Sequence, residues 1–410
     1  MRTKRGISAA LAMLTICGGF GTFRNTSTLI SSINVKAASV QTQSWYGITK
    51  DGFNYALDGT YNILEDGTVN INIESTRITG YSGEETIINI PKSVNGHEVT
   101  SIERAAFSYN NDITDVIIPD GLKEIPPSAF ANCTSLKSVT IPKSVKKIGG
   151  GAFYMCTSLN YIYIPDNVQI IDSEAFMNCE NLEEIRLPNS LKEISSWMFK
   201  NCSNLSKVTM PNSCNTICSE AFRNCSSLKS IIIPNGTTGI TTFAFWECTS
   251  LESVYLPDGM EHISDGAFAE CTSLKYINFP NSITEFNSVD TFWKCTSLES
   301  VYIPKSVDYI WENPFVDCTS LKTIYGYKES AANEFASTYN FEFINVDDIA
   351  DIIGDVNGDK STNISDAVLL QKHLLGSGKL TQTQALSADI NSDGSVNSFD
   401  MVSLREILIK

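Results

Sequence analysis

A motif that returns every 23 residues constrains the fold of this chain more than any other feature of its sequence. Each copy holds a phenylalanine, a cysteine and a leucine at fixed spacings, and then a short β-rich run that closes with proline. These prolines are Pro119, Pro142, Pro165, Pro188, Pro211, Pro234, Pro257 and Pro280. A unit this short cannot enclose a core alone, so its apolar side chains become buried only when turns stack. We therefore predict a β-rich solenoid of about ten turns.

The cysteines follow the same period, which argues against a disulfide framework. Three residues after each repeat phenylalanine, Phe130 to Phe315, lies one of nine cysteines, Cys133 to Cys318. Cysteines at equal spacing in stacked turns are interpreted as small apolar side chains with weak thiol donors, aligned in one buried column. Cys214 and Cys218 lie outside this column, and a bridge between them remains an alternative to free thiols.

The segments at both ends of the repeat add detail to this prediction. Residues 53–55, 66–69 and 99–102 precede the regular turns, and Ile324-Tyr325-Gly326-Tyr327 and Phe341-Glu342-Phe343-Ile344 follow them. Together with the unit A-F-x-x-C-x-S-L-x-x-V-x-I-P, they resemble the BspA-like leucine-rich repeats of bacterial surface and secreted proteins. The resemblance implies one repeat domain over residues 53–346, with an opening hairpin cap and a closing cap that contains a helix over residues 330–339. It implies adhesion or binding and names no ligand.

The first residues predict export from the cell. Arg2, Lys4 and Arg5 precede a short apolar run over residues 7–16, and Val35-Lys36-Ala37 offers small residues for cleavage. We expect a signal peptide over residues 1–37, a leader over residues 38–52, and a secreted, extracellular protein in the cell-surface assembly of a bacterium. The net charge of −16 argues against a nucleic-acid partner, which requires a basic face. No later run predicts insertion into a membrane.

Two acidic loops of twelve residues near the C-terminus predict two calcium ions. Each loop has Asp or Asn at alternating positions, closes with aspartate, and leads into an amphipathic helix. Calcium prefers six to eight hard oxygen ligands, which such a loop can wrap around one ion. Ser361 and Ser395 are expected to bind through their carbonyl oxygens, and Asn363 and Asn397 through water. The full predicted set is Asp355, Asn357, Asp359, Ser361, Asn363 and Asp366 in the first loop and Asp389, Asn391, Asp393, Ser395, Asn397 and Asp400 in the second.

This duplicated loop and helix, opened by Gly354-Asp355-Val356-Asn357-Gly358-Asp359, resembles a type I dockerin. The resemblance implies a small all-α module over residues 352–410, after a linker over residues 347–351. It also implies calcium-dependent folding and docking to a cohesin module of a scaffoldin, as in a cellulosome. The recognition positions of the family correspond here to Ile364, Ser365, Lys372, Ser398, Phe399 and Arg405.

No combination of residues predicts catalysis. The three histidines lie in unrelated segments, and the column cysteines recur too regularly for an activated nucleophile. We expect a non-catalytic binding protein that recruits a protein, cell-surface or polysaccharide ligand. Tyrosines on the outer side of the predicted strands form the candidate ligand face: Tyr161, Tyr163, Tyr255, Tyr276, Tyr302 and Tyr325. The alternatives are an adhesin or spacer without a specific ligand, and an unrecognised plant cell-wall hydrolase.

Overall fold

The computed structural model describes residues 40–64, 68–277, 279–286, 288–346, 354–359, 361–376, 378–380, 382–390, 396 and 398–409. The chain divides into two compact units, Met1–Cys179 and Glu180–Lys410, referred to as unit 1 and unit 2. In the described part of the chain, no helix is both long and apolar enough to cross a membrane.

Unit 1 opens with a sheet of long antiparallel strands. β1 (Gln41–Ile48) pairs with β2 (Phe53–Ile63), which pairs with β3 (Val69–Tyr81). The short strand β7 (Ser101–Ile102) then runs parallel to β3 and joins this sheet to the repeat. Leu57 and Ile78 are fully buried beneath the hairpin. The structure thus has a hairpin of β2 and β3 where the sequence predicts the opening cap, and β1 adds a strand from the segment expected to be a leader.

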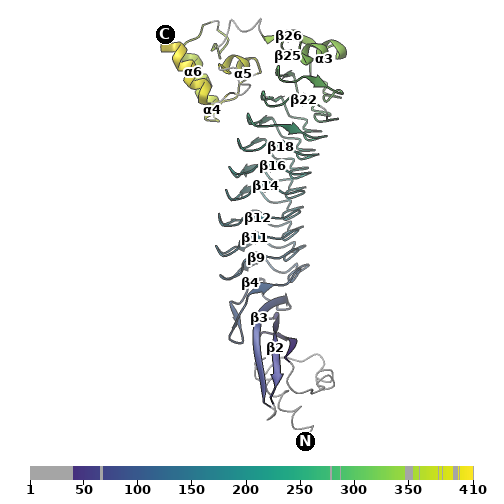
Figure 1. Cartoon of the computed structure of the whole chain (residues 1–410), viewed down its shortest axis with the longest axis vertical. Coiled ribbons are helices and arrows are strands. Elements are labelled where there is room, and N and C mark those ends of the chain that lie inside the picture. The colour runs from purple at the N-terminus through teal and green to yellow at the C-terminus, as the bar shows by residue number, and fades with distance from the viewer. Residues whose placement is uncertain are drawn as a thin grey trace. The chain divides into compact units, whose positions relative to one another are not determined.

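The following turns of unit 1 stack in register, with short strands in two columns (Figure 1). In the last of these turns a single bridge at Tyr161 stands in place of the first strand. One parallel ladder contains β4 (Ile87–Asn89), β8 (Asp115–Ile117) and β10 (Ser138–Thr140). The other contains β9 (Glu124–Ile125), β11 (Lys147–Ile148) and β12 (Ile170–Ile171). A small hairpin, β5 (Ser93–Val94) with β6 (His97–Glu98), lies between the cap and the turns. In β10 the middle residue, Val139, is buried, and its neighbours Ser138 and Thr140 face outward. We call this outward side of the first ladder the outer strand face.

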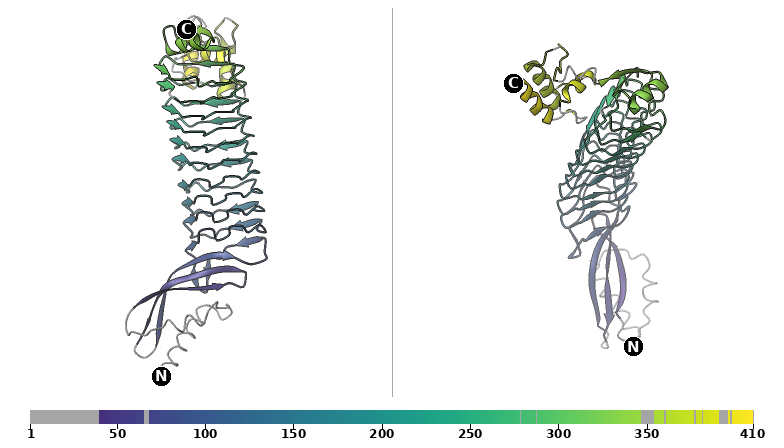
Figure 2. Two further views of the ribbon diagram at one scale, coloured as in Figure 1. Left: turned by 90° about the vertical axis from the view of Figure 1, so that its right-hand side faces the viewer. Right: turned by 45° about the horizontal axis from the view of Figure 1, so that its top comes forward.

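Unit 2 continues the same pattern, and its short strands align in columns from turn to turn (Figure 2). The strands of its outer strand face are β13 (Glu184–Arg186), β15 (Lys207–Thr209), β17 (Ser230–Ile232), β19 (Ser253–Tyr255), β21 (Tyr276–Ile277), β23 (Ser300–Tyr302) and β25 (Thr323–Gly326). The second ladder contains β14 (Glu193–Ile194), β16 (Thr216–Ile217), β18 (Gly239–Ile240), β20 (His262–Ile263), β22 (Glu285–Phe286) and β24 (Tyr309–Ile310). The closing cap is α3 (Ala331–Tyr339) with β26 (Glu342–Asn345), which pairs with β25.

The core of the repeat consists of side chains that recur once per turn. In unit 2 the rings of Phe199, Phe222 and Phe245 stack with centroids 5.3 and 5.2 Å apart. Beside them runs the cysteine column, in which eight of the nine thiols are seen to donate to the phenylalanine carbonyl of the preceding turn. For example, Cys248 Sγ lies 3.1 Å from the carbonyl oxygen of Phe222. Burial raises the pKa of the Cys248 thiol to about 12, which favours the protonated form that donates this bond.

A left-handed backbone residue explains why asparagine often precedes the column cysteine. Asn132 has φ 62° and Asn224 has φ 57°, and asparagine tolerates this conformation better than most residues. The Asn224 amide also donates to the side-chain oxygen of Asn201 one turn earlier, at 3.1 Å. These asparagines therefore shape the turn and link it to its neighbour.

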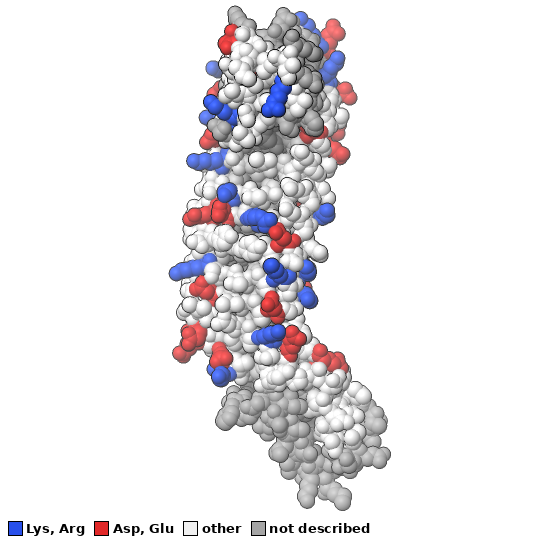
Figure 3. All heavy atoms as spheres, turned by 90° about the vertical axis from the view of Figure 1, so that its left-hand side faces the viewer, with Lys and Arg blue, Asp and Glu red and all other residues white. Residues whose placement is uncertain are grey.

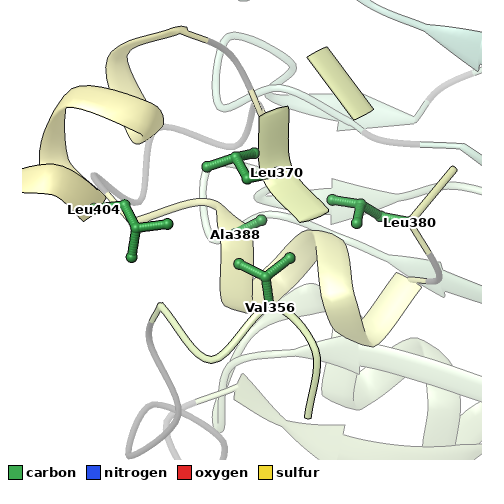
Figure 4. Close-up of a cluster of buried hydrophobic side chains, with 5 residues drawn as sticks. All are labelled: Val356, Leu370, Leu380, Ala388 and Leu404. Carbon is green, nitrogen blue, oxygen red and sulfur yellow. The ribbon is translucent and has the colours of Figure 1, made fainter. Parts of the chain in front are cut away.

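Three helices follow the repeat in unit 2. They are α4 (Ile364–Leu374), α5 (Gln382–Ala388) and α6 (Ser398–Ile409), and with the loops between them we call them the helical module. Its buried cluster has only five members, drawn in Figure 4: Val356, Leu370, Leu380, Ala388 and Leu404. The amide of Gly354 donates to the carbonyl of Ser387 at 2.8 Å, which ties the start of the module to α5. The sequence predicts α4 and α6 but not α5.

Candidate functional site

The first acidic loop is held in shape by its two terminal carboxylates. Asp355 is only 3% exposed and Asp366 is fully buried, which is unusual for charged side chains. Asp355 Oδ1 accepts hydrogen bonds from the amides of Gly358 (2.8 Å) and Asp359 (3.0 Å). Asp366 accepts from the amides of Asn357 (2.9 Å) and Asn363 (2.8 Å), one with each oxygen. The loop is thus folded around two fixed acidic groups.

The same loop also starts the helix that follows it. The side-chain oxygen of Asn363 accepts from the amide of Ser365 at 2.8 Å, and Asp366 returns a bond to the Asn363 amide. This reciprocal pair is a capping box, which satisfies two amides at the start of α4. Asn357 Oδ1 accepts from the Asp359 amide at 2.8 Å. Asn363 and Asp366, both predicted ligands, therefore also fix the first turn of α4.

The chemistry of this set fits a hard cation. Every predicted ligand of the first loop offers oxygen, which suits calcium and not the softer metals. Asn357 and Asn363 are half-buried, while Asp359 and Ser361 are exposed. Within the residues that the structure describes, no three His, Cys, Asp or Glu side chains come together in an arrangement that could hold a metal ion. The fit to calcium therefore rests on the oxygen donors and on the two buried carboxylates.

The second loop is described only at its two ends. Asp400 is fully buried, and its Oδ1 accepts from the amide of Ile390 at 2.9 Å, much as Asp366 accepts in the first loop. Asp389 is half-buried. The other four predicted ligands lie outside the described residues: Asn391, Asp393, Ser395 and Asn397.

The predicted cohesin-binding positions lie on α4 and α6. Ile364 is 72% exposed, which is unusual for an isoleucine at the start of a helix. Ser365, Lys372 and Arg405 are exposed as well. Ser398 and Phe399 begin α6, and their side chains lie outside the description. The structure thus exposes an aliphatic side chain and two basic side chains on this module.

The candidate tyrosine face is only partly exposed, which corrects the expectation from sequence. Tyr161 and Tyr163 are each 51% exposed, but Tyr302 is 7% and Tyr325 is 9% exposed. Both buried tyrosines lie on strands that further elements contact: α5 lies against β23, and α3 and β26 lie against β25. The side chains of Tyr255 and Tyr276 are outside the description, although their strands are present. Of the candidate tyrosines, Tyr161 and Tyr163 in unit 1 are therefore the ones whose exposure would allow contact with a ligand.

Cys214 and Cys218 do not form a bridge. Both remain thiols, as do the described cysteines of the column. Burial raises the pKa of the Cys218 thiol to about 11, and the nearby charge of Glu193 raises it further. The alternative of a disulfide between these two residues is therefore absent from the structure.

The turn segments between the strands of unit 2, which we call its loop side, carry a network of charged side chains that was not predicted from the sequence. Glu220 Oε2 lies 2.7 Å from Lys200 Nζ and 3.0 Å from an Arg223 nitrogen, and the Arg223 guanidinium lies 3.8 Å from the Trp246 ring centroid. Burial acts to raise the pKa of Glu220, but hydrogen bonds from Lys200, Trp197 and Arg223 outweigh it and lower this pKa to about 2. The signal was present in the sequence, because Lys200, Arg223 and Trp246 occupy one repeat position in successive turns.

Charges of both signs are interspersed on the face of the molecule drawn in Figure 3. Lys, Arg, Asp and Glu side chains alternate there with uncharged residues and do not gather by sign. This face therefore has no continuous basic patch, in keeping with the net charge of −16.

Comparisons with known proteins agree with the two parts of the chain. The family model of the BspA-type leucine-rich repeat region matches residues 100–229 and 215–340, and that of the type I dockerin domain matches residues 353–409. No curated protein matches the chain.

Several solved structures are similar to the repeat. A leucine-rich repeat protein from Bacteroides ovatus is 32% identical, with a TM-score of 0.57, over 65% of this chain and 69% of that one. A leucine-rich cell-surface protein from Faecalibacterium prausnitzii is 28% identical over 74% of this chain and 95% of that one, with a TM-score of 0.41. A leucine-rich repeat protein from T. pallidum is 25% identical over 56% and 87%, with a TM-score of 0.40.

Both matched families are binding modules, and type I dockerins bind calcium and imply a cohesin partner. The repeat match extends over more than half of the chain, and the dockerin match includes both acidic loops and all three helices of the module. The chain therefore belongs to the BspA-type leucine-rich repeat family, and it carries a C-terminal type I dockerin domain.

Proposed function

We propose that this protein is an exported, non-catalytic binding protein that docks onto a cohesin module of a scaffoldin through its calcium-loaded dockerin. The repeat then presents a ligand-binding face to a protein, a cell surface or a polysaccharide. The observation that carries this proposal is the dockerin match over two loops whose closing carboxylates, Asp366 and Asp400, are both fully buried. A buried carboxylate is costly unless it is paired or coordinates a metal ion.

Two calcium ions are proposed, one in each loop. In the first loop, Asp355 and Asp366 would hold the ion from opposite ends, with Asn357, Asp359 and the Ser361 carbonyl between them. The ion supplies positive charge where the chain has placed buried negative charge. Since the described part of the module has a buried cluster of five hydrophobic side chains, ion binding contributes directly to its folding free energy.

Titration calorimetry of the full chain against a panel of cohesins tests the docking. We expect binding to at least one cohesin in calcium, and its loss with chelator or with Asp366→Ala. Asp308→Ala, which removes an exposed aspartate from the repeat, is the matched control and should bind normally. If no cohesin binds although calcium increases the helical signal, the docking proposal is wrong and an adhesin becomes the better explanation.

For the ligand face we propose the exposed tyrosine pair of unit 1. Tyr161 and Tyr163 follow Ser138 and Thr140 of β10 by one repeat, in a turn that has a single bridge at Tyr161 in place of a strand, and Thr140 pairs with the 44%-exposed Ile117. Exposed tyrosines on a rigid sheet serve as interface anchors and offer ring faces on which sugars stack.

Pull-down with plant cell-wall polysaccharides and with bacterial cells tests this face. The double variant Tyr161→Ala/Tyr163→Ala should lose most of the binding of the natural protein. Tyr309→Ala removes a tyrosine of similar exposure (54%) from the second ladder and should retain it. A spacer without a specific ligand would show equal binding for all three proteins.

A further inference from the structure

The outer strand face of unit 2 changes abruptly from exposed to buried along its length. Ile232 at the end of β17 is 75% exposed, whereas Tyr302 at the end of β23 is 7% exposed. Ser230 and Ser253 are direct partners on neighbouring strands, yet Ser230 is exposed and Ser253 is 2% exposed. Because these residues hold equivalent positions in the repeat, the repeat pattern itself does not explain the difference. A segment outside the repeat must therefore cover the turns that contain β19 and β23.

The helical module contacts the repeat at these later turns. α5 lies against β23, and Lys379, just before α5, places its Nζ 3.0 Å from Glu252 Oε2. The hydrogen bond from Lys379 lowers the pKa of Glu252, as an opposite charge in contact should. Burial is the main cause that raises the pKa of Tyr302, and the neighbouring Tyr327 and the charge of Asp389 add to it. Asp389 directly follows α5. The contact of α5 with β23, the Lys379–Glu252 ion pair and the effect of Asp389 on Tyr302 therefore place α5 and its flanking residues over β19 and β23.

The cohesin-recognition positions whose side chains are described stay exposed in the same arrangement. Ile364 is 72% exposed, and Ser365 on α4 is exposed as well. The module therefore contacts the repeat with α5 and its flanking residues. Of the positions predicted to bind cohesin, Ile364, Ser365, Lys372 and Arg405 are exposed beside this contact.

We propose that the helical module is a reversible cover for the outer strand face at β19 and β23, and that a ligand which uses Tyr302 must displace it. The one described ion pair of the contact, between Lys379 and Glu252, is half-exposed, and such pairs stabilise weakly. The contact re-forms readily because the module is attached to the repeat, which keeps its effective concentration high. The cover is independent of cohesin binding, so a failure of the docking proposal leaves it intact.

Hydroxyl-radical footprinting of the full chain, read by peptide mass spectrometry, measures the cover directly. Tyr163 serves as the exposed internal reference. In the natural protein we expect Tyr302 to be oxidised at least tenfold more slowly than Tyr163. Lys379→Glu places two carboxylates together and should raise Tyr302 oxidation by about fivefold. The charge swap Glu252→Lys/Lys379→Glu should restore most of the protection.

Lys229→Glu is the matched control, because Lys229 is exposed and lies one repeat before Glu252. It makes the same change in net charge as Lys379→Glu and should leave Tyr302 protected. Glu252→Lys tests the contact from the repeat side without altering the module, should the Lys379 variant lose helical signal. Equal oxidation of Tyr302 and Tyr163 in the natural protein would overturn the proposal. Unchanged protection of Tyr302 in Glu252→Lys would overturn it as well.

Discussion

The repeat and the helical module bury their side chains in opposite ways. In the repeat, each turn contributes the same phenylalanine, cysteine and leucine, and the Phe222 ring contacts identical rings on both sides. Among its described residues the module buries five hydrophobic side chains, of which only Leu370 and Leu404 hold equivalent positions in the duplicated loop and helix, and it adds fully buried carboxylates at Asp366 and Asp400. The repeat is therefore stabilised by contacts between neighbouring turns, and the module by its loops. The two regions should respond to different perturbations.

The largest effect is expected from Phe222→Ala in the repeat. Phe222 is fully buried between two stacked rings, and truncating such a side chain typically costs about 3–5 kcal/mol of unfolding free energy. Denaturant unfolding followed by circular dichroism should show this loss, while the helical module keeps its calcium response. The control Phe243→Ala removes a half-buried ring on the loop side and should cost clearly less. Equal costs would mean that the stacked column is not the main source of stability.

Calcium removal is expected to act on the module alone. If the free ion is at about 100 times its dissociation constant, chelation removes about 2.7 kcal/mol of stability at each site. Hydrogen exchange should then increase in α4 and α6 and remain slow in the strand columns. Loss of protection in the repeat at the same chelator concentration would contradict separate stabilisation of the two regions.

The sequence predicts the repeat far better than it predicts the module and its contact. Each column of the repeat occurs nine or more times, so one exception such as Asn110 does not obscure the pattern. The cap helix is also predicted closely, over residues 330–339 against the observed Ala331–Tyr339. α5 was missed because its seven residues, QTQALSA, have no charged side chain and too few turns for a clear apolar period.

The burial of Tyr302 could not be predicted from its own turn. Tyr163 and Tyr302 hold the same repeat position, in Tyr-Ile-Tyr-Ile-Pro in one case and Val-Tyr-Ile-Pro in the other, although only Tyr302 ends a strand. Their exposures differ because α5, about 80 residues further along, lies against β23. Periodicity gives the position of a side chain within its turn. It carries no information on a contact with a distant, non-repeating segment.

A smaller effect is expected from removing one thiol of the cysteine column. Cys248→Ala takes a donor from the Phe222 carbonyl, and the loss of one such bond with a small void should cost about 1–2 kcal/mol. The control Cys218→Ala removes a half-buried thiol outside the column and should cost less than half as much. Thermal unfolding of the two variants beside the natural protein measures the difference. A larger cost for Cys218 would show that the column thiols act only as space-filling groups.

The smallest effect is expected from pH, acting through Glu220 on the surface of the repeat. The folded pKa of Glu220 is about 2, below its ordinary value near 4.5, because Lys200, Trp197 and Arg223 hydrogen-bond its carboxylate. Its contribution is therefore fully present above pH 4.5 and is lost as the pH falls toward 2. The carboxylate is partly solvated, so we expect only about 1 kcal/mol from it.

Glu220→Gln isolates this contribution, because it keeps the size of the side chain and removes the titrating group. The variant should be less stable than the natural protein at pH 6, and the two should converge near pH 2, when unfolding is followed by denaturant titration. Glu247→Gln is the control, because Glu247 contacts only Arg223 of the same network, at 3.4 Å. If the difference between Glu220→Gln and the natural protein is constant from pH 6 to pH 2, the carboxylate contributes through packing alone. The surface network would then add nothing to the stability that the stacked columns provide.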